Sequence, residues 1–295
     1  MGGGKVQPYK IVTDSTANLP VDLIEKYGVE VLSLNYYVEG KEYKGYEKGQ
    51  QIDLEKFYVM MREKKEMHTS LVDMGEATEL VEGLFQAGED VLYLAFSSGL
   101  SGTYQAVSLV IKDLLEKYPE RNAVCVDTLA AALGEGLLVY YAIQNREKGM
   151  SLSENAKWVE ENKLHLCHWF TVDDLFFLKR GGRISAATAV VGTALNIKPV
   201  LHVDDEGHLI AMGKVRGRKK SLDALVAHME ESVINPEGQP VFISHGGCYE
   251  EAEYVAKKVK EKLPVGEVLI HVLDPVIGTH SGPGTMALFF MGEKR

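Results

Sequence analysis

The sequence predicts an α/β protein of two domains, comprising residues 8–155 and 156–295. In the first domain, short apolar runs alternate with longer amphipathic segments. This order is typical of a mostly parallel sheet with helices on both faces. Residues 91–96 are apolar at nearly every position, as expected of a strand covered on both sides. The second domain lacks this regular alternation, and its mixture of strands and helices predicts an α+β unit.

In the N-terminal domain, the first strand is expected at residues 9–13 and ends in the polar turn at 14–16. A helix over 19–27 carries Pro20 in its first turn, where the missing N–H costs no hydrogen bond. Residues 76–87 are predicted to be helical because their apolar side chains fall on one helical face. The other expected elements are strands at 29–38, 91–96 and 123–126 and helices at 53–64, 103–118 and 130–148.

The C-terminal domain is predicted to contain a hairpin of strands 198–203 and 208–214 around a polar turn. Its other strands are expected at 164–171, 241–244 and 268–272, and its helices at 153–162, 187–195, 221–232 and 249–263. Residues 277–284 contain three glycines and are expected to form a loop before the apolar run 286–290.

Composition excludes several classes of protein. The chain has 32 basic and 42 acidic side chains, a net charge of −10, which argues against nucleic acid or an anionic membrane as the main partner. Three scattered cysteines fit a reducing cytoplasm better than a disulfide scaffold. The longest uncharged stretch, 184–197, falls short of the roughly twenty apolar residues that span a membrane. We therefore expect a cytoplasmic protein without stable membrane insertion. His165 and His168 point to opposite faces of their predicted strand, and we predict no metal site.

Residues 96–104 join a buried strand to a helix and contain two glycines and the hydroxyls of Ser97, Ser98 and Ser101. Free N–H groups at a helix N-terminus form a cradle for a phosphate or carboxylate, although a serine-capped helix explains the same pattern. The segment is not a Walker loop, because no lysine follows its second glycine. Thr69 and Ser70 either converge on this cradle or only form a turn.

Two clusters of cations stand out in this acidic chain, at residues 179–183 and 214–220. They either recognise an anionic group or lie as solvated charge on the surface. His280 lies among the three glycines of 277–284, where it has little room to be buried without a role, so we predict that it is functional. His245 follows a strand, and a structural role is equally compatible with its position.

Five segments together resemble the DegV family over nearly the whole chain. They are residues 13–20, 69–70, 97–103, 180–184 and 277–284. The resemblance implies a bacterial fatty-acid-binding protein of two α/β domains, with the acyl chain buried and the carboxylate near the domain junction. It also implies a partner, an ATP-dependent fatty-acid kinase similar to dihydroxyacetone kinase, which converts the presented fatty acid to acyl phosphate for phospholipid synthesis.

The resemblance assigns roles to single residues. Thr69 and Ser98 resemble the hydroxyls that hold the carboxylate, and His280 resembles the histidine that orients them; Ser97 and Gly282 belong to the same binding segments. Two further residues, Arg183 and Arg216, resemble cations near the carboxyl end and the kinase-docking surface. The expected ligand is palmitate, stearate or oleate, with no cofactor, no metal and no catalytic residue in this chain, which would not be an enzyme by itself.

The chain departs from the family pattern at two places, and these leave the preferred acyl chain open. Residues 71–73 stand where members usually continue with proline and serine, and Thr128 and Ala132 replace common hydroxyls. Two rival functions also remain. A phosphotransferase subunit related to dihydroxyacetone kinase would need a small polar pocket around His280 or His245, whereas a carrier needs a long apolar one. An RNA-associated regulator using residues 216–220 would show steeply salt-dependent binding.

Overall fold

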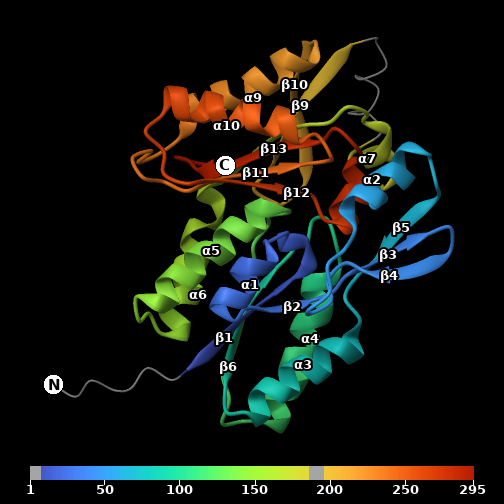
Figure 1. Cartoon of the computed structure of the whole chain (residues 1–295). Coiled ribbons are helices and arrows are strands. Elements are labelled where there is room, and N and C mark those ends of the chain that lie inside the picture. The colour runs from blue at the N-terminus through green and yellow to red at the C-terminus, as the bar shows by residue number, and fades with distance from the viewer. Residues whose placement is uncertain (1–7, 186–195) are drawn as a thin grey trace.

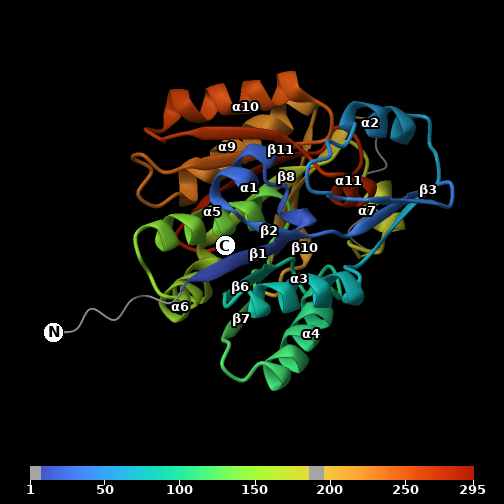
Figure 2. The ribbon, with the colours of Figure 1, turned by 60° about the horizontal axis from the view of Figure 1, so that its bottom comes forward.

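The computed structural model describes residues 8–185 and 196–295, which form two sheet-based halves packed against each other (Figure 1). Within these ranges the N-terminal sheet has four strands, all parallel. In spatial order they are β2 (Glu30–Leu32), β1 (Tyr9–Asp14), β6 (Asp90–Ala95) and β7 (Ala123–Asp127). Helices cover both faces of this sheet, as predicted (Figure 2). One face carries α3 (Met74–Gln86) and α4 (Thr103–Lys117), and the other carries α1 (Val21–Tyr27), α5 (Leu133–Glu147) and α6 (Leu152–Asn162).

In the described part of the C-terminal half, six strands form a mixed sheet. Their spatial order is β10 (Leu209–Arg216), β9 (Ile197–Val203), β8 (Leu166–Thr171), β13 (Met286–Met291), β11 (Val241–His245) and β12 (Val268–Val272). Neighbours are antiparallel except β11 and β12. Two helices, α9 (Arg218–Ser232) and α10 (Tyr249–Lys262), cover one face, and α5 packs on the other. The predicted hairpin of β9 and β10 is confirmed.

A small antiparallel sheet lies at the side of the molecule and was not predicted. It consists of β4 (Lys41–Lys44), β3 (Asn35–Val38) and β5 (Met67–Ser70), and α2 (Leu54–Arg62) connects β4 to β5. The single strand expected at 29–38 is wrong, because the chain leaves the parallel sheet after β2 and enters this one as β3. After β2, side-chain hydroxyls accept hydrogen bonds from backbone N–H groups in place of a neighbouring strand. The Ser15 hydroxyl accepts from the Leu34 N–H, and the Ser33 hydroxyl accepts from the Tyr46 N–H.

The glycine-rich segment expected to be a loop is largely helical. Helix α11 (Pro275–Ser281) begins after Asp274, whose Oδ1 accepts hydrogen bonds from the N–H groups of Val276 and Ile277. An N-capping aspartate followed by proline is a favourable start for a helix. The helix forms although it contains Gly278, so the glycine content of this segment wrongly predicted a loop. Helix α11 packs against β5, β3, α2 and the short helix α7 (Phe176–Arg180), so it belongs to the contact between the two halves.

Most other predicted elements begin or end within a few residues of those observed. The helix expected at 187–195 lies outside the described residues. The boundary expected between residues 155 and 156 falls inside α6, which packs on β7 and β6 of the N-terminal sheet. The chain passes to the second sheet only afterwards, through the 3₁₀ turn Lys163–His165. In the described ranges, no helix is long and apolar enough to cross a membrane.

Helix α5 lies between the two large sheets and contacts both of them. It packs against β1 and β6 on one side and against β8, β11 and β13 on the other. Two glycines allow this close approach. A Cβ on Gly134 would come within 2.4 Å of His168 Nε2, and one on Gly136 within 2.5 Å of the carbonyl oxygen of Ala17. Small residues on α5 therefore set how closely the two halves approach.

We expect Gly134→Ala to lower the free energy of unfolding by about 1–3 kcal/mol, because the added methyl group overfills this contact. Alanine otherwise favours a helix over glycine by roughly 0.5–1 kcal/mol. The matched control is Gly83→Ala in α3, where a Cβ meets nothing within 4 Å and stability should stay the same or rise. Urea unfolding of both variants measures the difference. Equal stability of the two variants would show that α5 is not closely packed at Gly134.

Candidate functional site

A cavity of about 390 Å³ lies where the two halves meet. Its size falls in the range of small-molecule pockets. Most of its lining is apolar and comes from elements far apart in the sequence. Leu34, Phe96 and Leu100 line it from the N-terminal half, and Phe170, Ala287 and Phe289 from the C-terminal sheet. The start of α5 closes one part of the wall with two alanines, at 131 and 132. Such a lining is suited to a hydrocarbon group.

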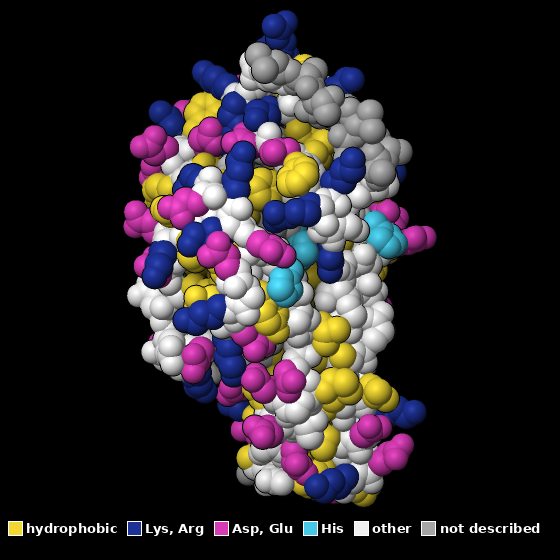
Figure 3. All heavy atoms as spheres, turned by 90° about the vertical axis from the view of Figure 1, so that its right-hand side faces the viewer, with side chains coloured by type: hydrophobic (Ala, Val, Ile, Leu, Met, Phe, Trp, Pro, Cys, Tyr) yellow, Lys and Arg dark blue, Asp and Glu magenta, His cyan; other side chains and the backbone are white. Residues whose placement is uncertain are grey.

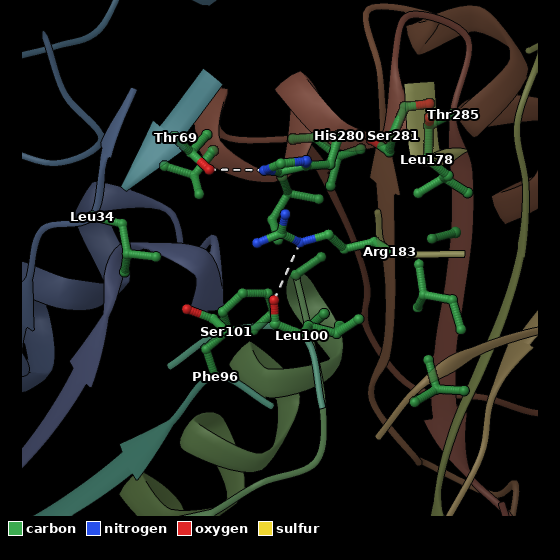
Figure 4. Close-up of a pocket in the computed structure, with 18 of the residues that line it drawn as sticks. Leu34, Thr69, Phe96, Leu100, Ser101, Leu178, Arg183, His280, Ser281 and Thr285 are labelled. Carbon is green, nitrogen blue, oxygen red and sulfur yellow. Dashed lines mark hydrogen bonds between the residues drawn. The ribbon is translucent and has the colours of Figure 1, made fainter. Parts of the chain in front are cut away.

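Polar side chains gather at one end of the cavity (Figure 4). Thr69 lies near the end of β5, and its side chain points towards His280 on α11. The Oγ1 of Thr69 lies 2.8 Å from His280 Nε2. The guanidinium of Arg183 lies below this pair, and Ser101 lines the cavity from the loop before α4, where its hydroxyl accepts a hydrogen bond from the Thr103 N–H at 3.2 Å. Ser281 also lines the cavity, and its buried hydroxyl has no hydrogen-bond partner in the described chain.

His280 is held neutral at physiological pH. Burial, together with the positive charges of Arg183 and Arg180, lowers its pKa from 6.5 to about 4. Gly181 packs against the Nδ1 side of the His280 ring, since a Cβ on Gly181 would lie 2.2 Å from Nδ1. A neutral imidazole has one N–H donor and one acceptor. If Nε2 donates to Thr69, the threonine hydroxyl proton is free to bind an anion in the cavity.

Arg183 places a positive charge in the cavity without a carboxylate to neutralise it. Its Nε donates to the carbonyl oxygen of Leu100 at 3.2 Å, and its Nη1 donates to that of Gly181. Within the described ranges no acidic side chain forms an ion pair with it. Burial lowers its pKa, which reflects the cost of a charge held away from water. A bound anion would offset this cost.

Two predicted serines do not reach this cavity. The Ser97 hydroxyl donates to the carbonyl oxygen of Gly207 at 2.9 Å and so ties β6 to the turn of the β9–β10 hairpin. The N–H of Ser98 donates to Asp127 Oδ1 at 3.2 Å, and Ser98 is not among the residues that line the cavity. The tight turn that follows β6 brings Ser101 to the cavity instead. The sequence motif contained Ser101, but spacing alone did not indicate which of its three hydroxyls faces inward.

The remaining predicted residues lie near the site or on the surface. Gly282 has a φ of 85° and follows α11, where a Cβ would meet the ring of Phe177 at 2.5 Å; it does not line the cavity. Arg216 is exposed at the end of β10. Its neighbour Arg218 is instead a structural residue, paired with Glu251 and Asp173. Of the predicted set, the structure therefore brings Thr69, Arg183 and His280 together.

His245 lies outside the cavity lining and is buried at the end of β11. Its Nδ1 accepts a hydrogen bond from the Cys248 N–H at 3.1 Å, and its ring contacts Tyr249. Burial lowers its pKa to about 4. These contacts give His245 a structural role in the turn before α10. Among the described residues, no group of three or more histidine, cysteine or acidic side chains is arranged to hold a metal ion.

Fold and site together define a two-domain α/β protein with an apolar pocket at the domain junction and an anion-attracting group at one end. The chain belongs to the DegV family. The family model described as "Uncharacterised protein, DegV family" matches residues 8–293. A DegV domain-containing protein of Clostridium perfringens is 44% identical over 294 residues, covering 98% of this chain and 99% of the relative.

Solved structures of DegV proteins share the fold. One is described as showing fatty acid binding of a DegV family protein from Thermus thermophilus; it is 32% identical, with a TM-score of 0.87, and the match covers 97% of this chain and 99% of that one. A fatty acid binding DegV family protein from Streptococcus agalactiae is 29% identical, with a TM-score of 0.84 and coverage of 98% and 100%. The two-domain α/β architecture predicted from the sequence is thus confirmed.

We expect His280 to make the stability of the ligand-free protein depend on pH. Below pH 6.5 the unfolded chain takes up a proton at His280, whereas the folded protein does not until about pH 4. Its contribution to stability is therefore complete above pH 6.5 and is lost as the pH falls towards 4. Between pH 7.5 and 5, the wild type should lose about 2 kcal/mol more than His280→Gln. Urea unfolding at both pH values measures this, and equal losses would contradict the neutral, buried state of His280.

Proposed function

We propose that this protein binds a long-chain fatty acid, with the acyl chain in the apolar cavity and the carboxylate at its polar end. The observation that carries the proposal is the guanidinium of Arg183, which has no acidic partner among the described residues and meets the Thr69 and His280 pair at one end of an otherwise apolar pocket. Ser101 and Ser281 line the cavity as well. The fatty-acid-binding relatives from T. thermophilus and S. agalactiae support the same ligand class.

The two ends of the pocket contribute differently to binding. Each buried CH₂ group contributes roughly 0.8 kcal/mol, so a sixteen- or eighteen-carbon chain contributes more than about 10 kcal/mol before the costs of ordering and association. The polar end chiefly offsets the cost of removing a carboxylate from water, and it fixes the orientation of the chain. A small polar substrate would leave these apolar walls uncovered, which disfavours the dihydroxyacetone-kinase-like alternative.

The second part of the proposal is that this carrier presents the carboxyl group to an ATP-dependent fatty-acid kinase in the cytoplasm and performs no catalysis alone. Arg216 supports this, because it is exposed and no ion pair or hydrogen bond occupies it in the described chain. On the face that carries α2 and α7, basic side chains are interspersed with acidic and hydrophobic ones (Figure 3). That mixture offers a protein partner complementary contacts, but it offers RNA no continuous basic surface on this face.

We expect denaturation of the purified protein to release about one long-chain fatty acid per chain, because the tail should keep the lipid bound through purification. Mass spectrometry of the extract measures its amount and identity. No released lipid, together with no uptake of added palmitate, stearate or oleate, would exclude the carrier function.

Two serine variants localise the head group within the same assay. Ser101→Ala should weaken fatty-acid binding by roughly 1–3 kcal/mol, because Ser101 is the serine of this loop that lines the cavity. Ser98→Ala is the matched control, since Ser98 lies in the same loop but outside the cavity lining. A larger loss of affinity in Ser98→Ala would place the carboxylate elsewhere.

Arg216→Ala should leave fatty-acid affinity unchanged within about twofold and lower acyl-phosphate formation when the cognate kinase and ATP are supplied, because an exposed cation acts in docking and orientation. The charge-matched control is Lys157→Ala on α6, an exposed cation on another element. Fatty-acid titration and reconstituted kinase turnover on the same preparations separate the two effects. Turnover equal to that of the wild type would show that Arg216 is only a solvated surface charge.

A further inference from the structure

The guanidinium of Arg295 joins four segments that lie far apart in the sequence. Its Nε donates to the carbonyl oxygen of Leu166 at 3.1 Å, and its Nη2 donates to that of Lys163 at 2.7 Å. Its Nη1 donates to two further carbonyl oxygens, those of Leu129 at 2.7 Å and Asp204 at 3.1 Å. Arginine holds its donors in one rigid plane, so these bonds fix the four segments relative to one another.

Two of the four segments continue directly into the apolar wall of the cavity. Leu129 lies in the loop between β7 and α5, and the alanines at 131–132 of this loop line the cavity. Asp204 begins the turn between β9 and β10, and the paired residues on either side of it, Val203 and Leu209, line the cavity too. None of these lining residues comes from the elements that form the polar end. The bonds from the guanidinium therefore hold the hydrocarbon part of the cavity.

The loop between β7 and α5 has a strained backbone. Leu129 has a φ of 52°, and Ala132 has a φ of 54° with a ψ of −148°. Positive φ is unfavourable for a residue with a Cβ, and the conformation of Ala132 lies close to a region that glycine alone normally adopts. Such a conformation persists only where the surroundings impose it. Here Asp127 Oδ1 accepts from the Leu129 N–H at 3.1 Å, and the Ser97 N–H donates to the Ala130 carbonyl oxygen at 2.9 Å.

The turn of the β9–β10 hairpin packs against this strained loop. A Cβ on Gly207 would lie 3.2 Å from the Cα of Leu129, and the Ser97 hydroxyl donates to the Gly207 carbonyl oxygen at 2.9 Å. Arg295 bonds to the loop and to the turn with one nitrogen, Nη1. Because the loop belongs to the N-terminal half and the turn to the C-terminal half, the arginine fastens the two halves to each other beside the apolar wall.

We propose that Arg295 is a positioning residue that sets the longest acyl chain the cavity accepts. This inference rests on the proposed fatty-acid binding and concerns only the hydrocarbon part of the ligand. Each added CH₂ group improves binding until the cavity is filled, and further carbons then have to displace residues of the wall. Without the bonds from Arg295, the strained loop relaxes and the turn moves away from it, so the wall yields to a longer chain.

The test is a series of saturated fatty acids, from myristate to the 22-carbon acid, titrated into the lipid-free, full-length protein. Wild-type affinity should rise with chain length and then fall about tenfold from the best chain to the 22-carbon acid. Arg295→Met keeps a long side chain but removes every donor, and the fall should shrink to less than about threefold.

The outcomes of this series separate the inference from the proposed function. An Arg295→Met profile parallel to that of the wild type, even if all affinities are lower, would give the arginine a purely structural role and overturn the inference. A wild type that binds the 22-carbon acid as tightly as any other chain would overturn it as well. In both cases fatty-acid binding stands, whereas a wild type that binds no member of the series would refute the proposed function itself.

Two further variants distinguish positioning from a general loss of stability. Arg146→Met is the matched control, because Arg146 also donates to a backbone carbonyl oxygen, that of Tyr27, but lies outside the cavity lining. Its length profile should equal that of the wild type, and a shifted profile would contradict the assignment to Arg295. Ser97→Ala removes the other hydrogen bond to the hairpin turn and should shift the profile towards longer chains. If Arg295→Met does not fold, an unchanged profile in Ser97→Ala overturns the inference.

Discussion

The packing of α5 between the two large sheets is the constraint on which the rest of the structure depends. A helix normally has one face in solvent, but α5 is buried on nearly all sides because each sheet uses it as a cover. The two halves consequently share one continuous core that runs from β1 to β13. The cavity lies at the N-terminal end of the helix, where Ala131 and Ala132 line it. Because these two side chains are small, they leave the space between the sheets open.

A network of buried acids and hydroxyls holds α5 against the N-terminal sheet. Glu135, fully buried, receives Thr13 Oγ1 and Thr16 Oγ1 on its two carboxyl oxygens at 3.1 Å each, and Thr16 also contacts Asp14. Because Thr16 has a single hydroxyl proton and lies against both carboxyl groups, a proton on one of the two acids supplies the second hydrogen bond. Burial supports this by raising the pKa of Glu135 well above 4.5. Asp14 extends the network to the pocket, because its Oδ2 accepts from the N–H of Phe96.

The pocket itself separates two kinds of physical contribution. Its apolar walls come from strands and helices of the rigid core, whose side-chain alternation fixes which residues face inward. Its polar end comes from the ends of three elements: β5 provides Thr69, α11 provides His280, and the turn after α7 provides Arg183. The ends of helices and strands, and the turns between them, can place charged groups where backbone amides and water remain accessible. The arrangement combines apolar walls and a polar end in one cavity.

The sequence by itself determined the α/β alternation, the hairpin of β9 and β10 and the family, since these follow from local periodicity and short motifs. It indicated His280 from its place among three glycines and Arg183 as part of a cation cluster, whereas the role of Thr69 came from the family resemblance. The tertiary structure alone decided that Ser101 rather than Ser98 lines the pocket and that α11 is a helix. It also decided that His168 belongs to the wall of the cavity. Local pattern indicates which residues share a face or a turn, but what that face meets depends on elements more than a hundred residues away, such as α5 against β8 and β13.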